Sequence, residues 1–496
     1  MERPRPAPQT DAFAADVNLA DGVLAHARDQ PDRPALEFAG RTVTYGLLGR
    51  RVAAMAAGLQ KSGYAPGVRM ALVATDVETT AVGLLGAALA GLIVVPIAPD
   101  TPAEERDRLH ADLSIADTLG ERNVPLLVEQ GMGAPVVRPA GGDAPVTVML
   151  SSGTTGQAKA IEFSHRRQLW LLRAINAALG ASSANRYFAL VEPTFAFGRN
   201  PMLRVLDAGG TVVAEPLSGL GHFFQLMGAK AITDLSATPR HVREMLAEWR
   251  GNGPALPGIE RLLVSTAFLH HAERLEALRR ISPRLHVCLG MNEAGFVTIA
   301  RPEDVARVPD TVGKAMPGVA VGVVNESGQP LPPGEIGELR VAAPCIPEGY
   351  LGASETTRHH FRQGWFHPGD LATLDAEGFV HLHGRVDDRI NRSGLKIYPI
   401  EIERVLRAHP AVVDAAAIGM PARQSGEVPV AAVVLSTPVA AQTLLRWSRE
   451  RLPQGKAPIR VFALDALPRN AMGKVPSAEL RRILLARLAD DPKAGE

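Results

Sequence analysis

The sequence is poor in cysteine, in aromatic residues and in net charge. Its 496 residues include two cysteines, Cys288 and Cys345, and neither belongs to a CxxC pair or to a cysteine–histidine cluster. This spacing argues against a structural zinc site and against a secreted disulfide framework. Fifty-three basic residues are balanced by 52 acidic ones, so no overall field points to nucleic acid or to an anionic membrane. We therefore expect a cytoplasmic protein that binds no nucleic acid.

A continuous membrane-spanning run is also lacking. Residues 81–98 are apolar for long enough to suggest a membrane helix, but Gly83, Gly86 and Gly91 interrupt them and Pro96 lies near their end. The amino-terminal residues 1–10 are rich in proline and arginine without a following apolar signal core, which predicts a flexible tail.

The apolar stretch is better explained as part of a βαβ unit. Residues 69–73 read as a strand, Asp76 as a helix cap, Gly91 as a stop and residues 92–95 as a second buried strand. Similar alternation of short Val/Ile/Leu runs with helical patterns continues through Val212, Ile232 and residues 262–264. The pattern predicts an α/β fold with mostly parallel sheets.

The chain is long enough for roughly three folding units, at about 150 residues each. From about Pro317, glycine and proline recur at short intervals, as in turns between short antiparallel strands. A final segment from near Asp387 carries its own strand and helix signals, including a helix at 401–408. We predict a large domain, 1–386, of two sheet lobes plus a small β-barrel, and a smaller α+β domain, 387–496.

An apolar strand at 146–150 runs directly into a loop suited to holding phosphate. The residues concerned are Ser151, Ser152, Gly153, Thr154, Thr155, Gly156 and Lys159. Glycines let backbone N–H groups converge on phosphate oxygens, the hydroxyls add donors and the lysine adds positive charge. The common P-loop is excluded because Lys159 follows Gly156 by three residues. Composition alone would favour a surface turn, so other segments must decide.

Further segments follow in a fixed order. They are Thr44-Tyr45, residues 91–96, Leu289-Gly290-Met291-Asn292-Glu293, Pro368-Gly369-Asp370-Leu371, Gly384-Arg385-Val386-Asp387-Asp388, and Pro468-Arg469-Asn470 with Gly473-Lys474. Together with the phosphate loop they resemble the adenylate-forming superfamily over nearly the whole chain. That superfamily includes acyl- and aryl-CoA synthetases, adenylation domains of non-ribosomal peptide synthetases and firefly luciferase.

The resemblance implies an acid:thiol ligase that uses ATP and Mg²⁺. A carboxylate would attack the α-phosphorus of ATP, pyrophosphate would leave, and a thiol would then take the acyl group from the acyl-adenylate. Lys474 would bridge the α-phosphate and the carboxylate as the adenylation catalyst. Glu293 would hold the Mg²⁺, and Asn292 would contact the α-phosphate. Taken alone, a lone glutamate or a lysine near a chain end has an ordinary structural explanation.

The remaining nucleotide and thiol contacts are also implied by the resemblance. Asp370 would accept hydrogen bonds from both ribose hydroxyls, Arg385 would contact the ribose or its phosphate, and Leu289 would offer an apolar face to adenine. Asp387 would be the hinge about which the small domain turns, and Gly394 would let a pantetheine arm pass close to the backbone.

Three positions depart from the pattern of that superfamily. Leu289 replaces a tyrosine, Asn292 a threonine and Pro368 a threonine. These changes keep open a nucleotide-binding homologue with weakened catalysis.

The acid pocket is expected to be apolar. Its predicted residues are Phe195, Ala196, Phe197, Gly198, Ala267, Gly290 and Met291. No aspartate occurs between Pro193 and Asn200 to pair with an ammonium group, which argues against an α-amino acid. The segment 195–198 is similar to the FAYG stretch of benzoate-type ligases, although core aromatics without a substrate contact are an alternative. We expect an aryl or a short- to medium-chain acid.

The thiol acceptor is expected to come from outside the chain. No carrier-protein signature follows Lys474, so coenzyme A is favoured, with the phosphopantetheine of a separate carrier protein as the alternative. A monomer or a homodimer fits the sequence.

Overall fold

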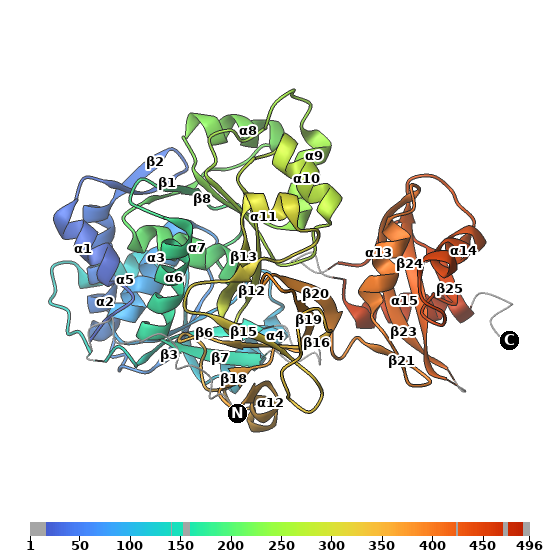
Figure 1. Cartoon of the computed structure of the whole chain (residues 1–496). Helices are drawn as coiled ribbons and strands as arrows, with labels where there is room; N and C mark the ends of the chain where they lie inside the picture. The colour runs from blue at the N-terminus through green and yellow to red at the C-terminus, as the bar shows by residue number, and fades with distance from the viewer. Residues whose placement is uncertain (1–15, 140, 152–158, 423–424, 470–474, 490–496) are drawn as a thin grey trace. The chain divides into compact units, whose positions relative to one another are not determined.

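The computed structural model (Figure 1) describes residues 16–139, 141–151, 159–422, 425–469 and 475–489. It divides into two compact units, residues 1–321 with 341–366 and residues 322–340 with 367–496. The predicted boundary between residues 386 and 387 lies within the second unit and stays a prediction about which part of the chain rotates. The predicted amino-terminal tail lies outside the described residues.

One sheet of the first unit brackets the predicted phosphate loop. Its strand order is β5-β3-β4-β6-β7. The strands are β3 (Arg69–Leu72), β4 (Ile93–Pro96), β5 (Ile115–Leu119), β6 (Pro145–Ser151) and β7 (Lys159–Ser164). All neighbours run parallel except β6 and β7, whose antiparallel register pairs Ser151 with Lys159. The two ends of the loop are thereby held side by side.

The predicted βαβ unit is confirmed between β3 and β4. Asp76 caps α3 (Val77–Leu89) by accepting a hydrogen bond from the Thr79 N–H across 2.7 Å. Gly91 follows the helix at a φ of +79°, a left-handed conformation that favours glycine. All residues of α3 except Glu78 are buried, which explains its apolar sequence. In the described part of the chain, no helix is long and apolar enough to span a membrane.

A larger sheet of the first unit has the order β14-β13-β12-β11-β10-β8-β9-β1-β2. Its strands are β1 (Pro34–Phe38), β2 (Arg41–Thr44), β8 (Arg186–Phe188), β9 (Thr211–Ala214), β10 (Asp234–Ala237), β11 (Arg261–Val264), β12 (Leu285–Met291), β13 (Gly295–Ala300) and β14 (Lys314–Ala315). The pairs from β12 to β1 are parallel, whereas β2, β13 and β14 add antiparallel edges. Ile232 lies just before β10 and outside a strand.

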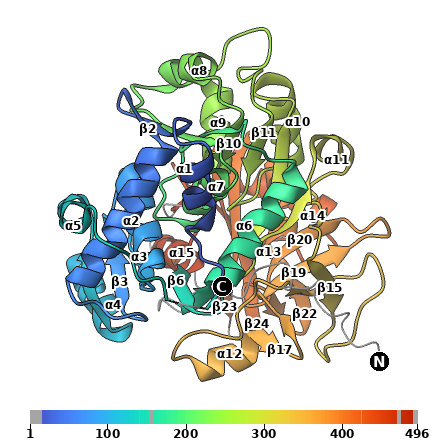
Figure 2. The same cartoon turned by 90° about the vertical axis from the view of Figure 1, so that its left-hand side faces the viewer.

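Helices cover these sheets and complete the first unit. They are α1 (Asp21–Asp29), α2 (Tyr45–Lys61), α4 (Ala103–Asp112), α5 (Val124–Gly131), α6 (His165–Leu179), α7 (Ala196–Asp207), α8 (Leu220–Ala229), α9 (Pro239–Glu248), α10 (His271–Arg280), α11 (Pro302–Arg307) and α12 (Ser354–His360). The helix α2 packs against α1, α3 and α5 (Figures 1 and 2). Short strands β17 (Phe361–Arg362) and β18 (Trp365–Phe366) follow α12.

The Gly/Pro-rich segment forms short strands, as predicted. These are β15 (Ala320–Val324), β16 (Gly337–Ala342), β19 (Asp370–Leu374) and β20 (Val380–Arg385); β16, β19 and β20 pair antiparallel, and β15 pairs with β16. The rest of the second unit comprises β21 (Ile390–Arg392), β22 (Leu395–Ile397), β23 (Val412–Ala422), β24 (Gly426–Leu435), β25 (Arg460–Ala463), α13 (Pro399–Arg407), α14 (Ala441–Arg451) and α15 (Ser477–Ala489). The predicted helix at 401–408 is α13, which begins earlier because Pro399 suits a first helical turn.

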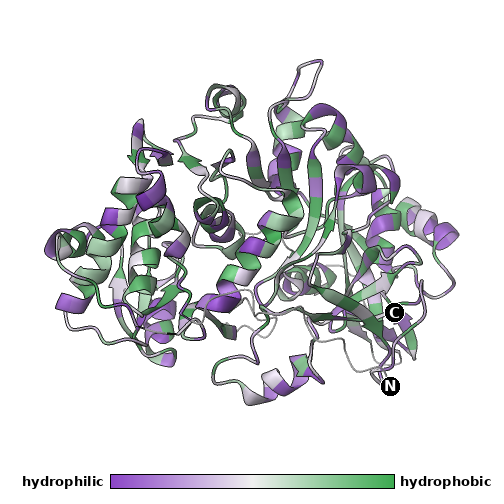
Figure 3. Ribbon diagram, turned by 60° about the vertical axis from the view of Figure 1, so that its left-hand side comes forward, coloured by the Kyte–Doolittle hydropathy of each residue, from purple (hydrophilic) through white to green (hydrophobic). Residues whose placement is uncertain are grey.

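The core of the second unit follows the two-residue period of β23 and β24. Ala415 and Ala417 belong to a buried cluster that also contains residues of α13 and α14. Ala416 and Ile418 belong to another cluster, which contains residues of α15. Successive side chains of a strand point to opposite faces, so this sheet is covered by helices on both sides. Figure 3 colours the ribbon by hydropathy, and its helices carry both hydrophobic and hydrophilic residues.

Candidate active site

Lys159, the last residue of the predicted phosphate loop, opens β7. Its Nζ lies 3.0 Å from His360 Nε2 and 5.4 Å from the centroid of the Tyr350 ring. Of the other predicted loop residues, Ser151 ends β6, while Ser152, Gly153, Thr154, Thr155 and Gly156 lie outside the described residues. The contact of the loop with phosphate therefore stays a prediction, and the position of its lysine is defined.

Glu293 is buried and hydrogen-bonded. It is 8% exposed, and its Oε1 accepts a hydrogen bond from the Tyr350 hydroxyl across 2.8 Å. The other oxygen, Oε2, receives no hydrogen bond from the described residues. Mg²⁺ commonly binds one or two carboxylates together with substrate phosphates and water, so one carboxylate with an available oxygen fits the role predicted for Glu293. The described residues contain no cluster of three or more His, Cys, Asp or Glu side chains suited to a metal.

Asn292 has a partner that the sequence did not indicate. Its side-chain Nδ2 donates to the carbonyl oxygen of Leu150 in β6, across 2.9 Å. The amide therefore supports the strand that enters the phosphate loop. This bond uses the donor end of the amide, and the predicted contact with the α-phosphate stays a prediction.

The end of β12 carries Leu289, Gly290 and Met291. A register shift against β13 falls between Leu289 and Gly290 and leaves Gly290 opposite Phe296. A Cβ on Gly290 would lie 2.9 Å from Phe296 Cδ1, closer than side chains normally pack. The absence of a side chain at residue 290 thus makes room for the Phe296 ring.

Phe197 and Phe296 form an aromatic pair. Their ring centroids are 6.1 Å apart at an interplanar angle of 63°, an edge-to-face arrangement. Phe296 was missed by the sequence interpretation because a phenylalanine within an apolar strand carries no signal beyond core packing. Phe197 and Gly290, both predicted to line the acid pocket, thus both lie next to Phe296, which was not predicted.

The segment 195–198 starts α7. Phe195 stands at the N-cap in an extended conformation, and Ala196 begins the helix. A Cβ on Gly198 would lie 2.1 Å from the Glu192 carbonyl oxygen, so only glycine lets this helix approach its preceding loop.

Ala267 lies half-buried in the loop after β11. In that loop, the Ser265 hydroxyl donates to the Cys288 carbonyl across 2.9 Å. This bond joins the loop to β12, the strand that carries Gly290.

Asp370 and Arg385 are neighbours in the second unit. They are register partners on β19 and β20, and Arg385 Nη1 lies 3.4 Å from Asp370 Oδ1. Arg385 Nη2 donates to the Pro368 carbonyl across 2.8 Å. Proline keeps its carbonyl acceptor, so the hydrogen bond to Arg385 is retained although Pro368 stands where the superfamily has threonine. The ribose contacts of both residues stay predictions.

The predicted hinge and thiol-passage residues lie on turns. Asp387 is exposed between β20 and β21. Gly394 has a φ of +86° between β21 and β22, and its N–H donates to Asn391 Oδ1 across 3.0 Å. Nearby, Lys396 Nζ lies 2.5 Å from Glu326 Oε1. Lys474 lies outside the described residues, so its catalytic role stays a prediction.

Both cysteines are free and buried. Burial raises the pKa of the Cys345 thiol to about 12 and raises that of Cys288 as well. Neither is a thiolate at neutral pH, and the thiolate is the nucleophilic form. This chemistry agrees with an acceptor thiol supplied from outside.

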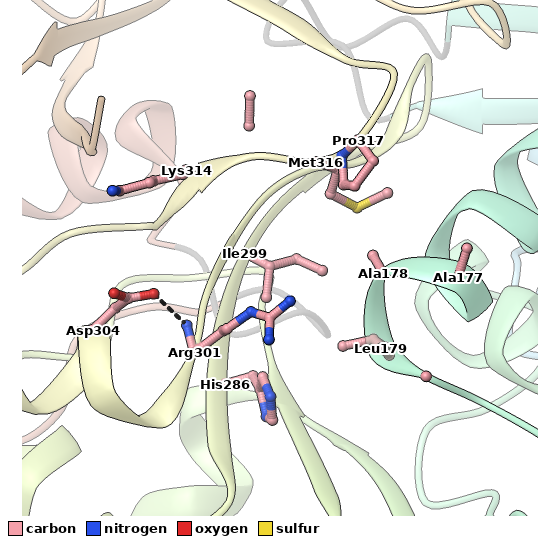
Figure 4. Close-up of a pocket in the computed structure, with 12 residues that line it drawn as sticks. Ala177, Ala178, Leu179, His286, Ile299, Arg301, Asp304, Lys314, Met316 and Pro317 are labelled. Atoms are coloured by element: carbon pink, nitrogen blue, oxygen red, sulfur yellow. Dashed lines mark hydrogen bonds between the residues drawn. The ribbon is translucent and has the colours of Figure 1, made fainter. Parts of the chain in front are cut away.

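A separate cavity of about 470 Å³ opens on the first unit (Figure 4). Its walls come from the ends of α6, β12, β13, α11 and β14, and none of the predicted site residues that the structure describes lines it. The lining residues are Ala177, Ala178, Leu179, Gly180, His286, Ile299, Arg301, Asp304, Lys314, Ala315, Met316 and Pro317. The volume of this cavity alone therefore does not make it the active site.

Comparison with protein families defines the class. The AMP-binding enzyme family model matches residues 23–116 and 110–351, and the model of the AMP-binding enzyme C-terminal domain matches residues 401–474. The chain belongs to the family of AMP-binding enzymes, which confirms the family predicted from the ordered motifs.

Individual relatives are similar over almost the whole chain. A feruloyl-CoA synthase of Amycolatopsis sp. is 31% identical, with 94% of this chain and 98% of the relative covered. A fatty acid–[acyl-carrier-protein] ligase, ScoC, of Streptomyces coeruleorubidus is 29% identical, with 92% and 94% covered. The crystal structure of ATP-bound MatB from Rhodopseudomonas palustris has a TM-score of 0.82 at 26% identity, with 94% and 99% covered. The predicted α/β architecture with a smaller C-terminal domain is confirmed.

Proposed function

We propose that this enzyme activates a carboxylic acid with ATP to give an acyl-adenylate and then transfers the acyl group to an external thiol. The observation that carries the proposal is the meeting of Lys159 and Glu293 at Tyr350. A lysine from the phosphate loop and a carboxylate suited to Mg²⁺ come from distant parts of the sequence. Their proximity supports a site for a metal-bound polyphosphate.

The first step needs positive charge and alignment more than a strong base. A carboxylate oxygen of the acid forms a bond to the α-phosphorus, and the bond to pyrophosphate breaks. Lys159 would bind the departing phosphates, and Lys474 would bridge the acid and the α-phosphate. Mg²⁺ held by Glu293 would supply charge neutralisation on the phosphates when bound.

In the second step, the sulfur of the acceptor thiol forms a bond to the acyl carbon and its proton is released to water. The bond from that carbon to the adenylate oxygen breaks, and AMP leaves with the bonding electrons. Coenzyme A is the favoured acceptor, and the similarity to a feruloyl-CoA synthase supports it. A separate carrier protein is the alternative, supported by the similarity to an acyl-carrier-protein ligase. Thioester formation with coenzyme A alone distinguishes the two.

The acid is proposed to be aromatic. The Phe197–Phe296 pair and the unsubstituted backbone at Gly290 support a flat apolar wall. Ala196, Ala267 and Met291 would line the rest of the pocket. Short- and medium-chain acids belong in the same screen as alternatives.

The test is acid-dependent exchange of labelled pyrophosphate into ATP, measured across aryl, short-chain and medium-chain acids with and without coenzyme A. We expect exchange with an aryl acid, its loss in Lys474→Ala, and its retention in Lys61→Ala. Lys61 serves as a matched control because its Nζ donates to the Gln130 carbonyl on the surface of the first unit. Stabilisation by nucleotide without exchange for any acid would instead favour a catalytically weakened homologue.

A further inference from the structure

We propose that Tyr350 is a positioning residue that holds the Glu293 carboxylate and the Lys159 ammonium at a fixed distance from each other. The inference rests on the proposed function and assigns a role to a residue that lies in none of the predicted motifs. Tyr350 is 8% exposed and contacts both groups, the carboxylate through its hydroxyl and the ammonium through its ring.

The backbone of Tyr350 is fixed to the strand that leaves the phosphate loop. Tyr350 forms an isolated antiparallel bridge with Ile161 of β7, and the Leu351 N–H donates to the Ala160 carbonyl across 2.9 Å. The position of the Tyr350 backbone therefore depends on β7, and the Tyr350 hydroxyl connects that strand to Glu293.

The hydroxyl of Tyr350 also selects which oxygen of Glu293 faces a ligand. It donates to Oε1 across 2.8 Å, which fixes the rotation of a carboxylate that is buried. A carboxylate held by one hydrogen bond presents its second oxygen in a defined direction, which would orient Glu293 to hold Mg²⁺.

His360 completes the arrangement on the lysine side. Its Nε2 lies 3.0 Å from Lys159 Nζ, and its ring stands edge-to-face with that of Tyr350 at a centroid distance of 5.9 Å. A lysine ammonium only donates hydrogen bonds, so Nε2 is the acceptor in this contact. His360 thus restrains the long Lys159 side chain over the Tyr350 ring, where a cation–π contact adds attraction.

The arrangement predicts that the two phosphate-binding groups act as one unit. Lys159 and Glu293 are held at opposite parts of a single tyrosine, the ring and the hydroxyl. A correct distance between them would allow Lys159 and a Glu293-bound Mg²⁺ to contact the same pyrophosphate group without rearrangement.

The decisive variant is Tyr350→Phe in the full chain, which keeps the ring and removes the hydroxyl. We expect about a tenfold increase in the Mg²⁺ concentration for half-maximal pyrophosphate exchange, the effect of losing one hydrogen bond to a charged group. The KM for the acid should change little. A second readout is thermal stabilisation by ATP, compared with Mg²⁺ and with EDTA. The extra stabilisation by Mg²⁺ should shrink in the variant.

The matched control is Tyr45→Phe. Tyr45 is fully buried in the same unit, and its hydroxyl donates to the Leu206 and Gly210 carbonyls at 3.0 and 2.7 Å. This control loses stability without contact to Glu293 or Lys159, so its Mg²⁺ dependence should equal that of the unmodified chain. A Mg²⁺ shift of equal size in both variants would assign Tyr350 a structural role only.

A pair of variants tests the lysine side and replaces the first test if Tyr350→Phe does not fold. His360→Gln keeps an acceptor oxygen, whereas His360→Leu removes it. We expect the KM for ATP to rise in His360→Leu and to be partly restored in His360→Gln. Equal values for both would overturn the role of the His360 acceptor.

Unchanged Mg²⁺ dependence and unchanged Mg²⁺–ATP stabilisation in Tyr350→Phe would overturn the inference. Failure of the proposed function is distinguishable, since an unmodified chain without exchange for any acid can still be compared with the variant by thermal stabilisation.

Discussion

The side-chain amide of Asn292 donates to the Leu150 carbonyl across 2.9 Å, while the adjacent Glu293 accepts from the Tyr350 hydroxyl across 2.8 Å. Leu150 belongs to the strand that enters the phosphate loop, and Tyr350 is bridged to the strand that leaves it. Two consecutive residues after β12 are therefore tied to opposite sides of the loop. This connection explains how a chain with asparagine at residue 292 can keep the loop and the carboxylate aligned.

The first prediction concerns the Asn292 amide. In Asn292→Ala the Leu150 carbonyl loses its side-chain donor, at a cost of about 1 kcal/mol. We expect the KM for ATP to rise roughly fivefold, as that energy converts to rate or affinity, with a smaller change in the KM for the acid. The measurement is pyrophosphate exchange at varied ATP. Asn325→Ala is the control, because Asn325 Oδ1 only orders an exposed turn; an equal ATP effect there would contradict the prediction.

A second prediction addresses the acid pocket at Gly290. In Gly290→Ala the new Cβ meets Phe296 at 2.9 Å, so the ring must move, and overpacking of this kind costs about 1–3 kcal/mol. We expect aryl acids to lose about tenfold or more in kcat/KM, while small aliphatic acids lose less. The KM for ATP should be conserved.

The control for Gly290→Ala is Gly228→Ala on α8, where an added Cβ meets no atom within 4 Å. That variant should activate every acid as the unmodified chain does. Aryl and small acids weakened to the same degree by Gly290→Ala would argue against an aromatic pocket at Phe296.

A third prediction uses pH and the ion pairs of Asp414. Arg407 Nε lies 3.2 Å from Asp414 Oδ1, and Arg469, at the start of the predicted end motif, is its second partner. Burial alone would raise the pKa of Asp414, but the two arginines outweigh it and hold the pKa below its ordinary value. Asp414→Asn should therefore cost about 2 kcal/mol of unfolding free energy at pH 7.

The sign of the pH effect follows from the depressed pKa. The stabilisation from Asp414 is complete above the pKa of an unfolded aspartate, about 3.9, and is lost as pH falls through the lower folded pKa. The difference in melting temperature between the unmodified chain and Asp414→Asn should thus be constant near neutrality and shrink below about pH 4. A difference that persists undiminished at pH 2 would refute this assignment.

A fourth prediction concerns Glu326, which pairs with Lys396 beside the predicted thiol-passage residue Gly394. Glu326 Oε1 lies 2.5 Å from Lys396 Nζ and 3.2 Å from Arg389 Nη1, and the hydrogen bond from Lys396 lowers the pKa of Glu326. Glu326 precedes the predicted hinge at Asp387, whereas both cations follow it, so rotation about the hinge would separate them.

We expect Glu326→Gln to accelerate thioester formation relative to pyrophosphate exchange. Because the pairs are exposed, the difference from the unmodified chain should fade at high salt. Single-turnover measurements of both half-reactions at low and high salt provide the check. Glu450→Gln is a control, since Glu450 makes a surface pair with Arg451 on α14. A difference between the variant and the unmodified chain that does not depend on salt would exclude a role of these ion pairs in restraining rotation about Asp387.

Much of the fold was predictable because it depends on local patterns. The strand–helix–strand unit from β3 to β4 was read from an apolar run, an aspartate cap and a glycine stop, and each signal has a local physical cause. The limits of α13 differed by two residues at the start because proline fits the first helical turn. Positions such as Ile232, at the edge of a strand, depend on neighbouring strands and were placed less accurately.

The site was predictable in its residue types and much less in its internal contacts. Glu293 and Lys159 were identified from ordered motifs, but Tyr350, His360 and Phe296 were not, since none of them stands at a periodic or motif position. Their roles arise from contacts between segments far apart in the sequence, for example 201 positions between Lys159 and His360.

The sequence by itself determined the family, the order of the elements and the residue types of the predicted site. The reason is that spacing within a motif and capping of a helix depend only on residues close together in the sequence. The tertiary structure alone decided that Asn292 supports Leu150, that Glu293 is held by Tyr350 and that Phe197 meets Phe296. Such partners belong to segments far apart in the sequence, which come together only when the chain folds. A linear pattern can specify that a carboxylate is present, but only the three-dimensional fold fixes which hydroxyl orients it.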